Sequence, residues 1–305
     1  MTRSDSLRIY EQRINRVLDR IAADPAAEHS VGSLARVARF SPFHFHRVFR
    51  SLVGEPVHAY VRRMRLERAV FRMAHGPKES LTRIALEAGF ASSSDFSKAF
   101  RQAYGFPPSG FSRRRWLEES KIRQALLPNR GYGFEAEATA ESPDGFRVRV
   151  VERPAQPIAY VRVIGGFDPE KTMAAHERLM AWARARRLAA TSRLLGISPD
   201  DPEITPMERY RFDWGLTLPT GERADGDAGV SAGVIAAGRF AVVRCRGDVH
   251  MEYRAWTHLF RGWLPRSGYQ PTAAPALEWY HRDPTATGWT ELDLDCCLPI
   301  RPLGR

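Results

Sequence analysis

A segment of this chain repeats itself loosely, and the repeat constrains the fold more than any other feature of the sequence. Residues 45–56 read FHRVFRSLVGEP and residues 96–107 read FSKAFRQAYGFP, with five of twelve positions identical. The similarity extends upstream, where LARVARFS (34–41) corresponds to IALEAGFA (84–91). A solenoid needs three or more units to bury a continuous core. Two copies therefore predict two equivalent modules that perform one task at two places.

Each copy has the pattern of a short helix, a tight turn and a second short helix. In the first copy, Ser41-Pro42 is a hydroxyl cap followed by proline at the first helical position, and Gly54 ends the helix. The apolar positions of this helix are 45, 48, 49 and 52, and those of the second copy are 96, 99, 100 and 103. This pattern predicts a helix-turn-helix, whose second helix enters the major groove of DNA.

The opposite face of each second helix is polar and basic. Its residues are Phe43, His46, Arg47 and Arg50 in the first copy, and Ser94, Ser97, Lys98 and Arg101 in the second. Arginine and lysine can donate to guanine, serine can contact any base, and the outer arginines suit phosphate. The alternative interpretation is a plain solvated face on a helical bundle.

The distribution of charge favours the DNA interpretation. The chain carries a formal net charge of +11. Residues 1–115 hold 21 Lys/Arg and 10 Asp/Glu, whereas the remainder holds 25 of each. The whole excess lies in the segment with the repeat, which predicts a nucleic-acid-binding half joined to a neutral half.

The two segments LARVARFSPFHFHRVFRSLVGEPVHAYVRRMRLERA and IALEAGFASSSDFSKAFRQAYGFPPSGFSRR resemble the DNA-binding domain of the AraC/XylS family, over about residues 7–116. Glycine is usual at the turn of the family's second motif, where this chain has Gly89; the first copy has Arg39. The resemblance implies double-stranded DNA and RNA polymerase as partners. It also places Phe43, His46 and Arg47 in one major groove, and Ser93, Ser94, Ser97 and Lys98 in the next.

The texture of the sequence changes after a predicted linker, residues 119–144, which is rich in Pro and Gly and has little apolar periodicity. Segments typical of strands then alternate with two helical segments, 169–188 and 250–265. This order favours an α+β domain of two similar halves. We therefore expect three parts: a DNA-binding domain at 1–118, the linker at 119–144, and an α+β domain at 145–305.

The α+β part resembles a GyrI-like effector-binding domain, a duplicated SHS2 fold that follows the same DNA-binding domain in Rob-type regulators. The stretches that carry the resemblance include ERPAQPIAYVRVIGGF, AGRFAVVRCRGDVHMEYRAWTHLFRGWLPRSGYQP and PALEWYHRDP. The resemblance implies a groove between the two halves for a small, amphipathic, cationic effector. The expected fold is thus multidomain: an all-α tandem helix-turn-helix domain followed by an α+β GyrI-like domain.

An apolar site with aromatic walls and one carboxylate would bind a lipophilic cation through dispersion, cation–π contact and charge. Glu278 is the candidate carboxylate because of its place in the family's P-x-x-E-x-Y stretch. The other predicted ligand-binding residues are Tyr160, Trp214, Trp256, Trp263 and Tyr280. Asp213, Glu252 and Asp295 are the carboxylates to test if Glu278 is not the counter-charge. The alternatives are aromatics that only fill the core and a Glu278 on the strand surface.

A ligand-responsive transcription regulator, rather than an enzyme, is the function that the two resemblances favour. Some GyrI-like proteins hydrolyse small electrophilic compounds with a glutamate and a neighbouring aromatic hydroxyl, and Glu278 with Tyr280 or Tyr160 could do such acid–base work. Hydrolysis would then be added to DNA binding. A third possibility is an accessory DNA-binding protein with a vestigial sensor.

The remaining features of the sequence indicate the cellular compartment and argue against a bound metal. The three cysteines (Cys245, Cys296 and Cys297) form no CxxC pair, which fits a reducing compartment. His44 and His46 have no third ligand nearby, so neither a metal nor a cofactor is predicted. No apolar run approaches the roughly 18 residues of a membrane span, so we expect a cytoplasmic protein without membrane contact.

Overall fold

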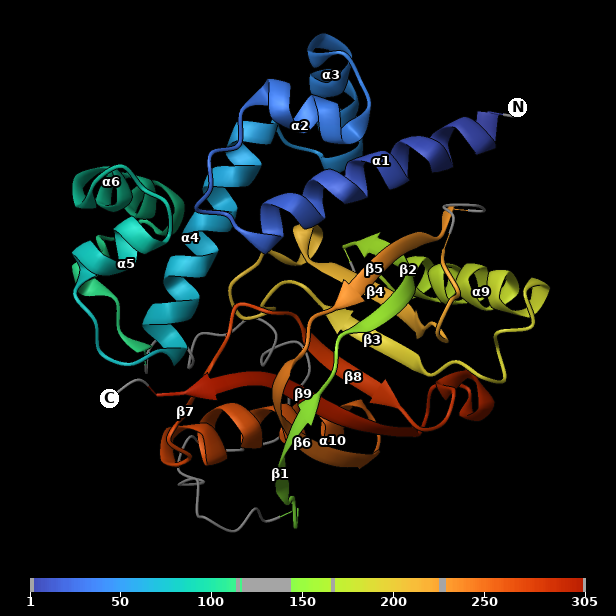
Figure 1. Cartoon of the computed structure of the whole chain (residues 1–305). Helices are drawn as coiled ribbons and strands as arrows, with labels where there is room; N and C mark the ends of the chain where they lie inside the picture. The colour runs from blue at the N-terminus through green and yellow to red at the C-terminus, as the bar shows by residue number, and fades with distance from the viewer. Residues whose placement is uncertain (1–2, 114–115, 117–143, 166–167, 225–228, 304–305) are drawn as a thin grey trace. The chain divides into compact units, whose positions relative to one another are not determined.

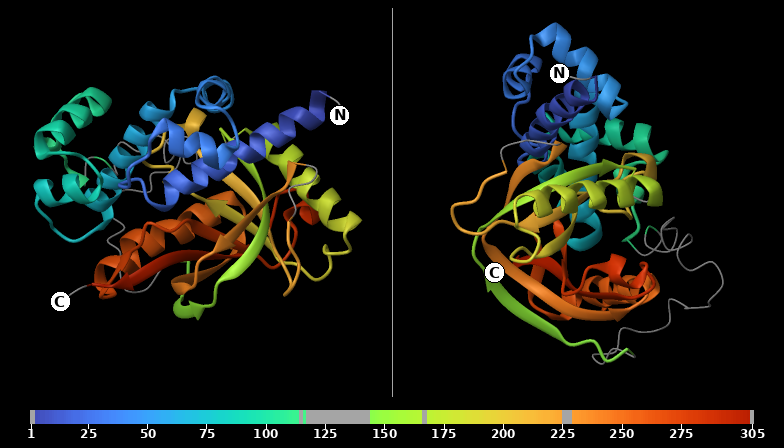
Figure 2. Two further views of the ribbon diagram at one scale, coloured as in Figure 1. Left: turned by 45° about the horizontal axis from the view of Figure 1, so that its top comes forward. Right: turned by 90° about the vertical axis from the view of Figure 1, so that its right-hand side faces the viewer.

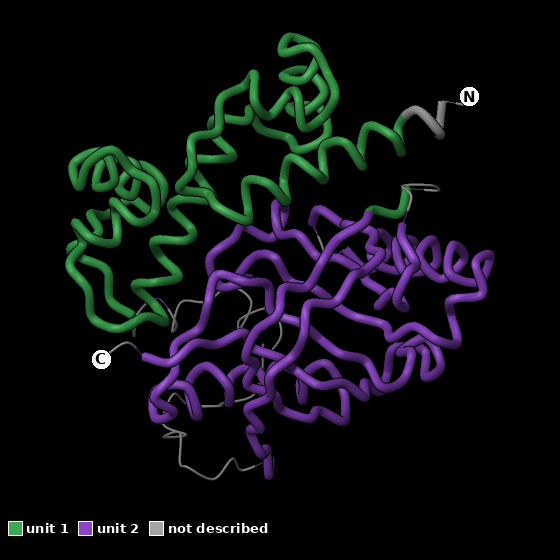
Figure 3. Tube along the Cα trace, in the orientation of Figure 1, with its two compact units in different colours: residues 1–113, 225–231 green, residues 114–224, 232–305 purple. Residues whose placement is uncertain are grey.

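The computed structural model describes residues 3–113, 116, 144–165, 168–224 and 229–303 (Figure 1). The chain divides into two compact units (Figure 3), one of residues 1–113 with 225–231 and one of residues 114–224 with 232–305. The predicted linker, residues 119–144, lies outside the described residues except for Asp144.

The first unit is helical, as the sequence predicts. Its described helices are α1 (Arg3–Ala23), α2 (Val31–Ala38), α3 (Pro42–Val53), α4 (Val57–His75), α5 (Leu81–Glu87) and α6 (Ser93–Tyr104), followed by the 3-10 turn Pro108–Gly110. The repeat forms the pairs α2–α3 and α5–α6, and α4 connects the two pairs (Figure 1). The predicted tandem helix-turn-helix is confirmed.

Equivalent aromatic residues form the buried side of the second helix in each pair. Phe45 and Phe49 on α3 are fully buried with their ring centroids 5.6 Å apart. Phe96 and Phe100, at the same places on α6, are also fully buried and lie 5.6 Å apart. Edge-to-face aromatic pairs of this kind contribute roughly 0.5–1.5 kcal/mol beyond the area that they bury. The identical phenylalanines of the repeat are therefore its core, which leaves its polar faces free.

The turns of the two motifs have the same left-handed backbone but different residues. Arg39 ends α2 with φ 54° and ψ 45°, and Gly89 follows α5 with φ +94°. Residues other than glycine rarely adopt this conformation. A Cβ atom at Gly89 would lie 2.5 Å from the Cα atom of Ala26 and 2.9 Å from Nε of Arg65. Glycine is thus required at the second turn by close packing, whereas arginine is accommodated at the first.

We expect Gly89→Ala to destabilise the helical unit by roughly 2 kcal/mol, because left-handed strain of about 1–2 kcal/mol is joined by an overlap with backbone. Gly105→Ala is the matched control, since Gly105 has φ +81° but no atom within 4 Å of the added Cβ. Urea unfolding of the full chain measures both changes. Equal losses for the two variants would contradict the packing argument.

The second unit is α+β. Its strands are β1 (Val148–Arg153), β2 (Gln156–Ile164), β3 (Leu194–Ser198), β4 (Arg211–Thr217), β5 (Ser231–Ile235), β6 (Gly238–Gly247), β7 (Tyr269–Pro271), β8 (Ala276–Tyr280) and β9 (Leu292–Pro302). Its two longer helices are α9 (Pro169–Ala185) and α10 (Val249–Thr257). The strands form one curled sheet in the order β1-β6-β9-β8-β3-β4-β2-β5, with β7 beside β9 (Figure 2).

The sheet contains two similar halves that meet at its centre. Each half runs strand, helix, strand, strand: β2, α9, β3 and β4 in the first, and β6, α10, β8 and β9 in the second. The last strand of each half lies between the other two, and β3 pairs with β8 at the seam. The expectation of a duplicated α+β fold is confirmed.

Candidate functional sites

The helix α3 presents the predicted DNA-reading face to solvent. Ser41 caps its start by accepting a hydrogen bond from the His44 amide, and Gly54 ends it in the left-handed conformation. Phe43 is 77% exposed, and His46, Arg47 and Arg50 are also exposed. The guanidinium carbon of Arg47 lies 6.0 Å from the centroid of this exposed ring. A base edge, such as a thymine methyl group, is a suitable contact for it.

The helix α6 has the same organisation with smaller polar residues. Ser92 caps it by accepting from the Asp95 amide. Ser94, Lys98 and Arg101 are exposed, whereas Ser93 and Ser97 are half-buried. Position 103, which the apolar stripe assigned to the core, is an exposed alanine.

The carboxyl group of Glu278 lies at the seam between the two halves of the sheet. Glu278 on β8 pairs with Gly196 on β3 and with Cys296 on β9. Gly196 pairs in turn with Trp214 on β4. Residues directly opposite each other in antiparallel strands share a face of the sheet, so these four positions form one row across that face. A Cβ atom at Gly196 would lie 2.3 Å from Oε2 of Glu278, which means that the carboxylate occupies the space that the missing side chain leaves.

Both long helices of the second unit cover this face. The Trp214 indole donates to the carbonyl oxygen of Thr172 on α9, at 3.1 Å. Glu252, in the first turn of α10, lies near Glu278, whose charge raises the pKa of the Glu252 carboxyl. Asp248 caps α10 by accepting from the Met251 amide at 2.9 Å. The cap fixes the helix start, and thereby the height of Glu252 above the sheet.

Burial raises the pKa of the Glu252 carboxyl well above its ordinary value, and the Glu278 charge and hydrogen bond raise it further. The pKa of Glu278 is also raised by burial, against the effect of hydrogen bonds from Glu252 and Tyr280. Each residue keeps some accessible surface. The start of α10 favours a charged Glu252 by about 0.3–1 kcal/mol, which is too little to offset burial beside a second carboxyl.

Tyr280 completes the contacts of Glu278. Its hydroxyl donates to Oε2 of Glu278 at 2.9 Å, and burial raises the pKa of this phenol well above its ordinary value. The Trp256 side chain lies near Glu252 and lowers the pKa of that carboxyl. The predicted site residues Glu278, Tyr280 and Trp256 are therefore brought together by way of Glu252.

Aromatic rings form the wall beside this carboxyl pair. The ring of Trp214 lies 5.5 Å from Tyr280 and 5.5 Å from Trp289. Trp214 itself is only 1% exposed, so its role is to support the ring of Tyr280 from the interior of the unit. Trp289 is half-buried and has φ 65°. A bulky residue in the left-handed region is strained, and such strain is concentrated at functional sites.

The structure does not bring two of the predicted residues to this site. Tyr160 pairs with Gly215 and lies in the buried cluster of Leu195, Leu277 and Cys297, on the opposite face of the sheet from Glu278. Side chains alternate between the two faces of a sheet along a strand, so the position of Tyr160 in β2 places its ring on the face opposite Glu278. Trp263, in the π-helical turn His258–Trp263 after α10, stacks on Tyr269 with ring centroids 5.9 Å apart.

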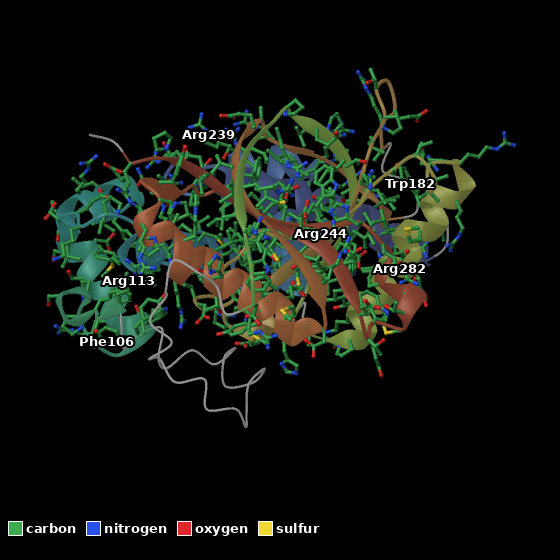
Figure 4. All side chains as sticks on the ribbon, turned by 90° about the horizontal axis from the view of Figure 1, so that it is seen from below. Phe106, Arg113, Trp182, Arg239, Arg244 and Arg282 are labelled. Carbon is green, nitrogen blue, oxygen red and sulfur yellow. The ribbon has the colours of Figure 1, made fainter. Side chains whose placement is uncertain are left out.

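The alternative carboxylates differ in their partners. Asp213 binds Arg162 at 2.6 Å, and Asp295 lies within 3.7 Å of Arg244 (labelled in Figure 4) and 3.2 Å of His281. Both are thus neutralised within the protein. By contrast, the described interactions of Glu252 and Glu278 include no basic side chain.

Three residues of this site were missed or only held in reserve by sequence reasoning. Glu252 lies 26 positions from Glu278, and no local pattern joins them. Gly196 carried a usable signal, because an isolated glycine inside a strand indicates a close approach. Trp289 carried none, since nothing in the sequence reveals its left-handed backbone. Within the described residues, no group of three or more His, Cys, Asp or Glu side chains could hold a metal.

Together, the fold and these sites define a two-part protein with a tandem helix-turn-helix unit and an α+β unit that places a carboxyl pair between two helices. The chain belongs to the family described as the GyrI-like small molecule binding domain, which matches residues 146–301. Residues 34–114 match the model of a helix-turn-helix domain. The chain is therefore an AraC-type DNA-binding transcription regulator with a C-terminal effector domain, as the sequence resemblance indicated.

Two relatives each match about half of the chain or less, and one solved complex covers most of it. A DNA gyrase inhibitor of Edwardsiella ictaluri (strain 93-146) is 32% identical over 161 residues, which are 51% of this chain and 98% of that protein. The uncharacterized HTH-type transcriptional regulator YbfP of Bacillus subtilis (strain 168) is 30% identical over 125 residues, 41% of this chain and 42% of that protein. The solved EcmrR–DNA complex is 12% identical with a TM-score of 0.44, and it covers 90% of this chain and 100% of that chain.

No helix among the described residues is both long and apolar enough to cross a membrane.

Proposed function

We propose that this regulator reads two successive major grooves of DNA with α3 and α6, and that its second unit binds a small amphipathic cation at Glu278. The observation that carries the effector proposal is the pair formed by Glu278 and Glu252, for which no basic side chain is among the causes of the pKa shifts within the described part of the chain. A cation is the ligand that relieves such a pair, and the adjacent aromatic rings suit an apolar, planar one.

The tandem repeat supports the DNA proposal because it replaces a dimer. Most helix-turn-helix proteins reach two grooves as dimers, with half-sites one helical turn, about 34 Å, apart. In this chain α4 connects the two readers and has 19 residues, which span roughly 28 Å at 1.5 Å each. The difference from the groove repeat favours a modest bend in the DNA. The readers are Phe43, His46 and Arg47 on α3, and Ser93, Ser94, Ser97 and Lys98 on α6.

Base and phosphate contacts are separable within α3. Arg47 and Arg50 are both exposed, and we assign Arg47 to a base edge and Arg50, with Arg101 on α6, to phosphates. Arg47→Ala is expected to cost about 1–3 kcal/mol on the preferred duplex and to relax sequence preference. Arg50→Ala is expected to weaken all sequences alike and to flatten the salt dependence.

Binding curves on preferred and scrambled duplexes at several salt concentrations measure both effects. Each arginine variant is the matched control of the other, because they differ only in position along one helix. An equal loss on both duplexes for Arg47→Ala would refute its assignment to a base.

The proposal includes RNA polymerase as the partner through which a regulator of this class changes transcription, and it places the protein in the cytoplasm with its DNA.

A second candidate activity rests on the 2.9 Å hydrogen bond between Tyr280 and Glu278. Because burial holds the pKa of Tyr280 high, the phenol stays protonated and could act as a general acid beside a carboxylate base. Hydrolysis of a small electrophile would then accompany DNA binding. Mass spectrometry of an epoxide or ester incubated with the full chain tests this. Turnover that Tyr280→Phe abolishes would support it, and equal product with and without protein would exclude it for those compounds.

A further inference from the structure

One arginine bridges the connection between α4 and α5. Arg72, near the end of α4, donates from Nη2 to Oε2 of Glu79 at 2.5 Å, and its Nη1 lies 2.6 Å from Oε2 of Glu87. Glu79 lies in the connection, residues 76–80, and Glu87 is the last residue of α5. The Arg72 side chain is 18% exposed. A guanidinium held through both terminal nitrogens in this way is directed at α5 and not at a DNA phosphate.

The two carboxylates approach Arg72 from one side of the segment 79–87. Glu79, Arg83 and Glu87 follow each other at intervals of four residues, which places them on one face of a helix. Arg83 lies 2.8 Å from Glu87 and 3.4 Å from Glu79, but it belongs to α5 itself and its side chain is 66% exposed. Two carboxylates that converge on one planar guanidinium fix the rotation of α5 about its own axis, because a turn of the helix breaks both contacts.

A rotation of α5 is transmitted to the reader α6. Phe90, just after α5, is buried against the fully buried Phe96 of α6, with ring centroids 5.3 Å apart. Gly89, at the turn between the two helices, is packed so closely against Ala26 that no Cβ atom fits there. The second motif therefore has a fixed point at its turn, and Arg72 sets its angle about that point.

The other end of α4 is fixed to the first reader by a separate ion network. Arg63 on α4 donates to Glu55 at 2.8 Å and 3.0 Å, and to Glu67 at 2.8 Å. All three side chains are largely buried. Glu55 lies in the three-residue connection 54–56, directly after α3. The longer connection, between α4 and α5, is thus the joint at which the angle between the two readers depends on Arg72.

We propose that Arg72 is a positioning residue that locks α6 at one angle to α3 and so sets the single spacing of base pairs that the two readers can contact together. This inference rests on the proposed reading of two successive grooves. Apolar packing alone is non-directional and lets packed helices turn against each other. The contacts of Arg72 with both carboxylates are directional, and they connect α4 to α5 without touching the faces of α3 and α6 that read DNA.

The test measures how strictly the full-length chain requires one spacing. The probe is a duplex of about 20 base pairs, or two helical turns, taken from the site that the chain occupies most strongly in genome-wide mapping. Two derivatives have one base pair inserted or removed at the centre, which shifts one half by about 3.4 Å and turns it by about 35°. Fluorescence anisotropy gives the dissociation constants. Wild type should bind the original duplex at least about tenfold more tightly than either derivative, because a misplaced reader loses its base contacts.

Arg72→Met removes the guanidinium and keeps an unbranched apolar side chain. We expect it to bind the original duplex about tenfold more weakly and the derivatives as wild type does, so that the preference for one spacing falls to about twofold or less. Arg83→Met is the matched control, because it removes a guanidinium from the same two carboxylates without breaking a link to α4. It should keep the spacing preference of wild type.

A second variant keeps the test valid if Arg72→Met fails to fold. Arg72→Met/Glu79→Gln also removes a carboxylate that would be left without its partner, and it should show the same reduced preference; urea unfolding verifies that each variant is folded. The proposal is overturned if the Arg72 variants keep the wild-type preference, which includes an equal loss on all three duplexes, or if Arg83→Met reduces it to the same degree. Equal binding of all three duplexes by wild type would contradict the two-groove proposal as well, whereas the other outcomes leave it intact.

Discussion

Replacing Glu278 by glutamine is expected to weaken the binding of an aromatic monocation about thirtyfold or more, which corresponds to 2 kcal/mol or more. The change removes the charge and keeps the shape. It leaves dispersion with Trp256 and the ring of Tyr280 intact, so a loss reports the ion pair. Quenching of tryptophan fluorescence by N-methyl-4-phenylpyridinium measures the affinity, because Trp256 lies near the carboxyl pair.

Two controls make this result specific. The neutral analogue 4-methylbiphenyl should lose little affinity, or gain some, because an unpaired carboxylate no longer has to be desolvated. Glu291→Gln removes an exposed carboxylate just before β9, and it should leave cation binding unchanged. Equal cation binding by wild type and Glu278→Gln would show that Glu278 is not the counter-charge. Glu252 would then be the remaining candidate, because Asp213 and Asp295 already have basic partners.

The double variant Arg47→Ala/Lys98→Ala is expected to remove sequence-specific DNA binding, with a loss of roughly 2–6 kcal/mol on the preferred duplex. Each base contact is worth about 1–3 kcal/mol, and changes at well-separated, independent sites add. Each single variant should lose preference in only one half of the duplex. Electrophoretic mobility shifts with duplexes scrambled in one half or the other measure this.

A matched control removes the same amount of positive charge but leaves the residues assigned to base contacts unchanged. Arg50→Ala/Arg101→Ala also removes two basic side chains from α3 and α6, but at positions assigned to phosphate. It should weaken both preferred and scrambled duplexes and leave their ratio close to that of wild type. If one reading variant alone abolished all preference, the two helices would not act as independent readers.

The helical unit was predictable because its signals are local. Ser41-Pro42 and Gly54 define both ends of α3, and the cap and glycine of the second copy define α6 in the same way. The turns of the two motifs show what the sequence alone does not reveal. The sequence shows an arginine where the second motif has glycine, but only the structure shows that Arg39 adopts φ 54° while no side chain fits at Gly89.

The effector site was predictable in part because it depends on strand register. The family pattern identified Glu278, and its neighbour Tyr280 shares its face two residues along the strand. Tyr160 was assigned to the same site, yet it lies on the other face, because a shift of one residue reverses a strand's side chains. Glu252 could not be identified from local sequence, since the capped start of α10 and the pairing of β8 together bring it to Glu278.

In vitro transcription tests the central account most directly. The template is the promoter that the full-length chain occupies most strongly in genome-wide mapping, and the reactions contain RNA polymerase with and without N-methyl-4-phenylpyridinium. Wild-type protein should change the transcript level, and the cation should alter that change. Glu278→Gln should still act on the promoter but ignore the cation, while Arg47→Ala/Lys98→Ala should do neither. A transcript level that is the same with and without wild-type protein, or a cation response that Glu278→Gln retains in full, would contradict the account.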